Sequence, residues 1–152
     1  GGFMIAIASD YAGYPLKEEI RHYLNEQGVA HEDLGTYSPN SVDYPLYGER
    51  LARGIAAGKY EKGILFCGTG IGISISANKV NGIRCCACSD VLSAKMSRLH
   101  NNTNVLALGA RIIGVDTAKM IVDTWLNTPF SNEERHERRI ALFSEIEKRN
   151  SR

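Results

Sequence analysis

Residues 62–79 read KGILFCGTGIGISISANK, and this strand-loop-helix pattern sets the fold class of the chain. The stretch opens with a short apolar run, which is typical of a strand buried in a parallel sheet. Cys67 ends the run, and Gly68, Gly70 and Gly72 alternate with other residues before a segment able to start a helix. A thiol placed there lies beside glycine amides and a helix N-terminus, whose partial positive charge favours a thiolate and attracts anions. The stretch therefore predicts an anion-binding site at the end of a strand.

Strands and helices alternate along the chain on both sides of this stretch. Apolar runs predict further strands at residues 3–8, 29–34, 83–88 and 104–108, and helical spacing predicts helices between them. This alternation predicts an α/β fold in one domain spanning residues 1–152. We expect a three-layer Rossmann-like sandwich, a five-stranded parallel sheet covered by helices on both faces, with an extra C-terminal helix.

The strand order decides which loops share an edge of the sheet. We assume the order 2-1-3-4-5, in which strands one and three are neighbours at the point where the order reverses. Ligands of such sheets bind at this point, at the carboxyl ends of the strands. Asp10 and Cys67 follow and end those two strands, so we expect the two side chains to lie close together.

The apolar spacing of two expected helices predicts which of their faces are buried. The helix expected over residues 90–100 is predicted to turn Leu92, Met96 and Leu99 inward. The helix expected from about residue 131 to residue 149 carries an apolar stripe among many charges. We expect it to be an appendage, with its charged face meeting either solvent or a partner subunit.

Composition excludes several classes of protein. The net charge is +1, which argues against a nucleic-acid-binding protein. No segment approaches the roughly 20 apolar residues of a membrane span. Cys85 and Cys86 are neighbours on an expected strand and point to opposite faces, so they are not a metal-binding pair. Free cysteines in a core suit the reducing cytoplasm, where we expect the protein to work.

The glycine loop leaves three interpretations open. A dinucleotide-binding fingerprint needs G-x-G-x-x-G, but Ile73 stands where the third glycine would fall. Asp90 lies at a suitable distance for a ribose-binding acid, so a non-catalytic nucleotide-binding module remains an alternative. A tight turn with no further role is the third, although three alternating glycines beside a thiol exceed what a turn requires.

Histidine and arginine supply further candidates outside the loop. His100 lies in the segment SRLHNNTN, residues 97–104, directly before a strand and not at its carboxyl end. It therefore reaches the Cys67 loop only through a fold-over or from another subunit. Arg111 follows the fifth strand, and Arg135 and Arg139 share one helical face beside His136. Arginine side chains suit phosphate, but each taken alone is by default a solvated charge.

These residues together resemble the sugar-phosphate isomerase family of ribose-5-phosphate isomerase B, which also includes the subunits of galactose-6-phosphate isomerase. Residues 67–79 are similar to the signature of that family, and further matches run in register along almost the whole chain. They are Ser9-Asp10 with Gly13, Val42-Asp43-Tyr44-Pro45, His100-Asn101 with Thr103-Asn104, Gly109-Ala110-Arg111, and Arg135-His136 with Arg139.

The resemblance implies an aldose–ketose isomerase that needs neither a metal nor an organic cofactor. Cys67 is then the base that moves a proton between C1 and C2, and His100 assists opening of the sugar ring. Thr69 and the amides of the loop from Gly68 through Gly70 to Gly72 stabilise the enediolate. The remaining roles are binding of the sugar by Asp10, Asp43, Tyr44 and Asn101, and of the phosphate by Arg111, Arg135, His136 and Arg139.

The resemblance also implies a homodimer, or a tetramer made of two dimers, with the site at the subunit interface. One departure concerns the sugar, because Tyr11 stands where the family commonly has histidine. Tyrosine donates a hydrogen bond but carries no positive charge, so the change affects a substrate contact. An allose 6-phosphate or other hexose 6-phosphate isomerase is therefore an alternative. Compared with the galactose-6-phosphate isomerase subunits, the chain keeps both Cys67 and His100 and the Asp43-Tyr44-Pro45 form. We therefore favour a self-sufficient isomerase that interconverts D-ribose 5-phosphate and D-ribulose 5-phosphate.

Overall fold

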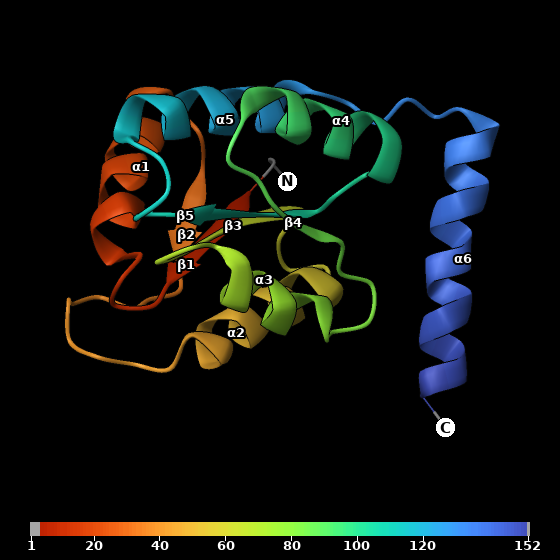
Figure 1. The fold of residues 1–152 in the computed structure, drawn as a ribbon, viewed down its shortest axis with the longest axis horizontal. Helices are drawn as coiled ribbons and strands as arrows, with labels where there is room; N and C mark the ends of the chain where they lie inside the picture. The colour runs from red at the N-terminus through yellow and green to blue at the C-terminus, as the bar shows by residue number, and fades with distance from the viewer. Residues whose placement is uncertain (1–3, 152) are drawn as a thin grey trace.

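A computed structural model of the chain describes residues 4–151, which are built around a five-stranded, wholly parallel sheet (Figure 1). The elements in chain order are β1 (Ile5–Ser9), α1 (Tyr14–Glu26), β2 (His31–Asp33), α2 (Tyr44–Ala56), β3 (Lys62–Cys67), α3 (Ile71–Asn78), β4 (Cys85–Ala87), α4 (Val91–Asn101), β5 (Val105–Gly109), α5 (Val115–Asn127) and α6 (Glu134–Asn150). This confirms the predicted α/β fold with an extra C-terminal helix; Phe3, at the start of the first predicted strand, lies outside the described residues.

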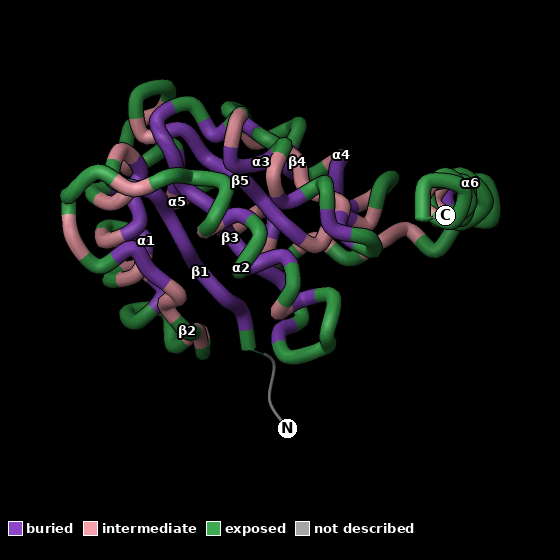
Figure 2. The backbone as a smooth tube through the Cα atoms, turned by 90° about the horizontal axis from the view of Figure 1, so that it is seen from below, coloured by how far each residue is buried: buried purple, intermediate pink, exposed green. Residues whose placement is uncertain are grey.

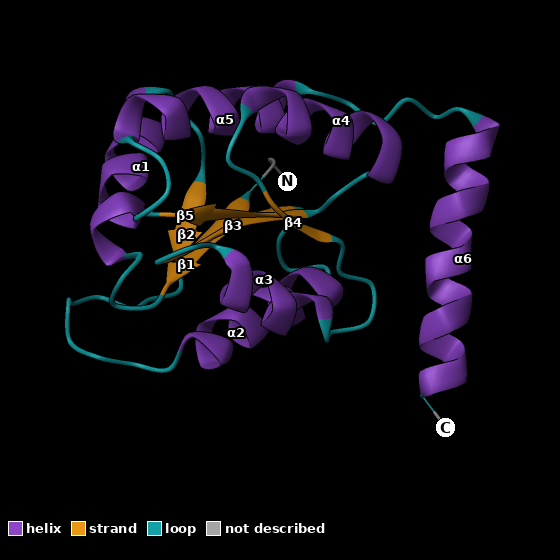
Figure 3. Cartoon of the chain, viewed as in Figure 1, coloured by secondary structure: helices purple, strands orange, loops and turns teal. Residues whose placement is uncertain are grey.

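Helices cover both faces of the sheet, as Figure 3 shows, with α1, α4 and α5 on one side and α2 and α3 on the other. The three central strands β1, β3 and β5 are fully buried and send alternate side chains to the two sides. In β1, Ile5 and Ile7 join the core against α1 and α5, whereas Ala6 and Ala8 join the core against α2 and α3.

The observed strand order is β2-β1-β3-β5-β4, so the assumed order 2-1-3-4-5 is wrong in its last two strands. The burial of the two strands gives the reason. Every residue of β5 is buried, which requires a neighbour on each side, whereas β4 has only three residues and none of them is fully buried. A short, half-exposed strand is suited to the edge of a sheet.

This exchange leaves the predicted ligand edge in place. β1 still pairs with β3, and Ser9 lies opposite Phe66 at their carboxyl ends. On the other side of β3, Cys67 lies opposite Gly109, the last residue of β5. The loops after β1, β3 and β5 therefore meet at one edge.

The helix α4 buries a different face from the one predicted. Leu92 is 64% exposed, and the buried residues are Ala94, Ser97 and Arg98. Arg98 is satisfied in that position because its guanidinium donates to the carbonyls of Thr128, at 3.0 Å, and Thr103, at 2.6 Å.

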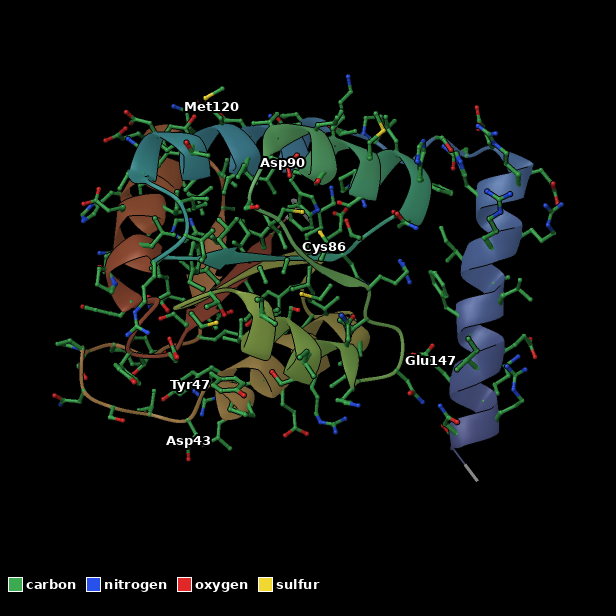
Figure 4. The ribbon with its side chains drawn as sticks, in the orientation of Figure 1. Asp43, Tyr47, Cys86, Asp90, Met120 and Glu147 are labelled. Atoms are coloured by element: carbon green, nitrogen blue, oxygen red, sulfur yellow. The ribbon has the colours of Figure 1, made fainter. Side chains whose placement is uncertain are left out.

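The helix α6 stands beside the body of the protein, and His136 is its only buried residue among those described (Figure 2). One of its few contacts with the body is a hydrogen bond of 2.7 Å from the Gly82 amide to Glu147, which faces that loop in Figure 4. Within residues 4–151, every helix is too short or too polar to span a bilayer.

Candidate active site

Cys67 ends β3 with its thiol facing the first turn of α3. Its Sγ accepts a hydrogen bond of 3.1 Å from the amide of Gly70, and the residue is only 5% exposed. Gly70 adopts φ +78, a left-handed conformation that lets this amide turn back toward the strand end. The sulfur thus faces the Gly70 amide and the N-terminus of α3, a place in a fold where anions bind.

The loop after β3 is joined to the loop after β5. The amides of Ala110 and Arg111 each donate a 2.9 Å hydrogen bond, to the carbonyls of Cys67 and Gly68 respectively. The two loops touch so closely that a Cβ on Gly109 would lie 2.5 Å from the Thr69 carbonyl oxygen. The side chain of Arg111 lies over Gly68, where a Cβ would come within 3.1 Å of a guanidinium nitrogen. A cation is thus held directly beside the thiol loop.

Asp10 is held at the same edge, directly after β1. Its carboxylate accepts a 2.8 Å hydrogen bond from the amide of Gly13, and its own amide donates to the Phe66 carbonyl at 3.2 Å. Gly13 is required here because a Cβ would lie 2.3 Å from the Phe66 backbone. The carboxylate is therefore fixed close to the end of β3, as the order-reversal rule predicts.

A buried ion pair braces this end of β1 from behind. Lys17, wholly buried, donates to both carboxylate oxygens of Asp33 at 2.6 Å and to the Thr36 carbonyl at 2.7 Å. The segment it fixes is bonded to Ser9 on both sides, since Ser9 donates to the Gly35 carbonyl and accepts from the Thr36 amide. Sequence reasoning missed this brace, because nothing in the spacing of the two charges marks them as partners.

These loops enclose a cavity of about 340 Å³. Tyr44 forms one wall, where its ring packs on Gly72 so closely that a Cβ there would lie 2.7 Å from the ring. Tyr11, at 39% exposed, forms part of the rim. The lining residues are Asp10, Tyr11, Ala12, Tyr44, Cys67, Gly68, Thr69, Ile71, Gly72 and Arg111.

A second group of predicted site residues gathers elsewhere, where α4 ends and α6 begins. The rings of His100 and His136 lie 4.5 Å apart between centroids. The Nδ1 of His136 lies 2.7 Å from the Ser131 hydroxyl and 3.5 Å from the Glu133 carboxylate. Burial first, and then the nearby His100 and arginines, lower the pKa of His136 against the opposing effect of Glu133. Arg135 and Arg139 are exposed on the first turns of the same helix, and Asn101 is exposed at the end of α4.

The two groups lie at opposite ends of the sheet. Cys67 is opposite Gly109 at the carboxyl end of β5, whereas the second group adjoins its amino end near Val105. Four strand steps of roughly 3.3 Å separate those ends by about 13 Å. One copy of the chain therefore does not bring His100 to Cys67.

Asp43 belongs to neither group. It precedes α2 as its N-cap residue, its side chain makes no capping hydrogen bond, and Figure 4 shows it pointing away from the body. Of the predicted sugar-binding residues of this loop, only Tyr44 lines the cavity. No group of three or more His, Cys, Asp or Glu side chains that would hold a metal ion occurs in residues 4–151.

Comparison with known proteins identifies the family. The profile of the Ribose/Galactose Isomerase family matches residues 5–143. Ribose-5-phosphate isomerase B of Escherichia coli (strain K12) is 48% identical over 95% of this chain and 97% of that protein. D-erythrulose-4-phosphate isomerase of Pectobacterium atrosepticum is 47% identical over 83% of this chain and 84% of that protein.

A solved structure agrees with these relatives. The ribose-5-phosphate isomerase B of Clostridium thermocellum has a TM-score of 0.96 and 48% identity over 98% of this chain and all of that one. The resemblance carried by residues 67–79 is thereby confirmed, and the chain belongs to the Ribose/Galactose Isomerase family.

Proposed function

We propose that this chain is an aldose–ketose isomerase that interconverts D-ribose 5-phosphate and D-ribulose 5-phosphate through an enediolate. The observation that carries the proposal is the Cys67 thiol, which accepts the Gly70 amide proton inside a cavity shared with Arg111. A thiolate is a suitable base for a carbon-bound proton, and the cation beside it is suited to a phosphate. Membership of a family whose relatives carry this activity supports the choice of substrate.

The residues around Cys67 have distinct proposed roles. The thiolate removes the proton from C2 of the aldose, which leaves negative charge on the oxygens of the enediolate. The thiol then returns the proton to C1, while the hydroxyl proton moves from O2 to O1, so that C2 becomes the carbonyl carbon of the ketose. The Thr69 hydroxyl and the first-turn amides of α3 line the same cavity and stabilise that charge. Such preorganised donors are usually the largest electrostatic contribution to catalysis. Asp10, fixed by Gly13, orients the sugar hydroxyls.

We further infer that a second copy of the chain completes the site. Its His100 opens the sugar ring, and its Arg135, His136 and Arg139 bind the phosphate together with Arg111 of the first copy. Exposed apolar side chains, which a stable subunit interface buries, lie beside both the Cys67 cavity and the group of residues around His136. Ile71, Ile75 and Ile112 adjoin the Cys67 loop and are 54–57% exposed, and Leu142, Phe143 and Ile146 on α6 are 42–56% exposed. A two-fold dimer pairs each surface with the other twice and forms two complete sites.

Activity measurements test the proposal directly. Ribose 5-phosphate is mixed with the protein, and ribulose 5-phosphate is measured as it forms. We expect turnover that Cys67→Ala abolishes and that Cys85→Ala, a matched thiol removed from β4, leaves intact. Absence of turnover by the unaltered protein at micromolar concentration, or full activity of Cys67→Ala, contradicts the proposal.

The sugar preference is tested in the same assay. Tyr11 at the rim of the cavity is the observation that keeps a hexose 6-phosphate under comparison. We expect a higher kcat/KM for ribose 5-phosphate than for allose 6-phosphate, and the reverse order identifies the chain as a hexose-phosphate isomerase. We also infer a cytoplasmic location for a single domain spanning residues 1–152, supported by the four free cysteines.

A further inference from the structure

Two thiols lie on the same side at the end of the edge strand β4, Cys86 within the strand and Cys88 directly after it. Cys86 and Cys88 are two residues apart, so their side chains leave one face of the strand. Their Sγ atoms lie 3.5 Å apart. Cys85, between Arg84 and Cys86, faces the opposite core against α2 and α3. The mechanism proposed above uses none of these three cysteines.

A polar network surrounds Cys86 and prepares it for reaction. Its Sγ lies 3.3 Å from the hydroxyl of Ser97, which in turn lies 2.9 Å from that of Thr103. The hydrogen bond from the Cys88 thiol, helped by these two hydroxyls, lowers the pKa of Cys86 to about 7 against the effect of burial. The same hydrogen bond, together with burial, raises the pKa of Cys88. The contact with Cys88 therefore favours ionisation of Cys86, whose thiol, while protonated, is placed to donate to the Ser97 hydroxyl and, at 3.8 Å, to the Val105 carbonyl.

Cys86 is also reachable from outside. Together with Cys85 it lines a cavity of about 410 Å³ between β4, the end of α4 and α6. Phe143 and Ile146, which belong to the surface proposed above to meet a second copy, form part of the wall on the α6 side. Cys88 is only 7% exposed and lies behind Cys86. A small reagent that enters the cavity meets Cys85 and Cys86. Burial raises the pKa of Cys85, so Cys86 is the thiol expected to react, and Cys88 is in contact with it.

The backbone geometry allows the two sulfurs to join. Residues two apart on a strand have Cα atoms about 6.6 Å apart, at the upper end of the roughly 4.4–6.8 Å that disulfides span. A disulfide also brings the Cβ atoms to about 3.8 Å, so the chain has to bend at Cys88, which lies directly after β4. Bond formation also needs a small movement of the sulfurs. β4 pairs only with β5, so no strand on its other side resists that movement.

We propose that Cys86 and Cys88 are a dithiol modification site, which forms a reversible disulfide when the protein meets a hydroperoxide. With hydrogen peroxide, the Cys86 thiolate attacks one oxygen, the O–O bond breaks, and the leaving hydroxide takes a proton from the solvent, which gives a sulfenic acid and one water. The Cys88 sulfur then attacks the Cys86 sulfur, the S–O bond breaks, and the leaving hydroxyl takes the Cys88 proton as a second water. Two thiols are oxidised to one disulfide, and one peroxide is reduced to two waters.

Tryptic mapping tests this site without any variant. Cleavage after Arg84 and Lys95 releases one peptide that contains Cys85, Cys86 and Cys88, while Cys67 falls in a different peptide. The protein is treated with hydrogen peroxide, its remaining thiols are alkylated under denaturing conditions, and the peptides are analysed by mass spectrometry. We expect the peptide 85–95 to lose two hydrogens and to carry a single alkyl group, on Cys85. Dithiothreitol before alkylation is expected to restore three alkyl groups.

Single cysteine variants identify which two thiols form the disulfide. Cys86→Ser and Cys88→Ser are expected to abolish the loss of two hydrogens, whereas the matched Cys85→Ser variant keeps it. The proposal is overturned if the alkyl group is found on Cys88, which indicates a bond between neighbours. It is equally overturned if Cys86 goes to a sulfinic acid with no bond, or if all three thiols still react after Cys67 has been oxidised.

Discussion

A mixture of two inactive variants tests the shared site most sharply. Cys67→Ala removes the proposed base, and His100→Ala removes the proposed ring-opening group, so each variant alone is expected to be nearly inactive on ribose 5-phosphate. The two residues adjoin opposite ends of β5 in one copy, about 13 Å apart by strand rise. If one copy supplied the whole site, no mixture of these variants would contain a complete one.

The expected recovery follows from two-fold symmetry. When copies exchange at random, half of the dimers are mixed, and a mixed dimer pairs the intact Cys67 of one copy with the intact His100 of the other. Its second site lacks both groups. One of its two sites is therefore complete, so the mixture should reach about a quarter of the activity of the unaltered protein.

The assay needs subunit exchange and a matched control. Equal amounts of the variants are unfolded together in urea, refolded and assayed, beside each variant refolded alone. The control mixes Cys67→Ala with Arg111→Ala, because both residues belong to the same cavity and no mixed dimer then has a complete site. No recovery in the first mixture, or equal recovery in the control, refutes the proposed sharing of the site.

Three further predictions concern the residues that support the site. In urea titrations, Lys17→Met should lower the free energy of unfolding by about 3 kcal/mol, because it leaves Asp33 as a poorly solvated carboxylate. The control Lys95→Met removes an exposed lysine and should change the free energy of unfolding by less than about 0.5 kcal/mol. Gly70→Ala should lower the free energy of unfolding by about 1–2 kcal/mol and remove most of the activity, because φ is +78 there and a Cβ would lie 2.9 Å from the β5 backbone. An unchanged kcat would contradict the role given to the Gly70 amide. Burial lowers the pKa of Lys62 to about 8, so the unfolded chain binds more protons than the folded one between pH 8 and 10.5, and stability due to this residue rises with pH across that window. Lys62→Met should therefore flatten the pH dependence of stability between pH 8 and 10.5 in urea titrations, and an unchanged slope would show that this amine is not its cause.

The thiol site was predictable because it rests on local rules. A buried strand ending in cysteine and followed by alternating glycines places a thiol at a helix N-terminus wherever the strand sits in the sheet. The meeting of Asp10 with Cys67 depends only on β1 and β3 being neighbours. The exchange of the last two strands did not affect it. The contrast between VLALG and CCA was a usable signal for that exchange, since only the first is apolar enough for a central strand.

Other features depend on partners that are distant in the sequence. Spacing did not show that α4 buries Arg98 instead of Leu92, because the compensating carbonyls belong to Thr103 and to Thr128 beyond α5. The contact of His100 with His136 likewise arises from the path of the chain between α5 and α6. Ser131, which orients His136, lies in that connection and carries no motif of its own.

The two backbone hydrogen bonds between the loops after β3 and β5 have a consequence for how this family diverges. They tie the backbone of Arg111 to the loop that follows Cys67, so the two loops move together as one backbone frame. We therefore expect a change of sugar preference within the family to come from exchangeable side chains at the rim of the cavity, such as Tyr11 and Tyr44, while this backbone frame stays the same.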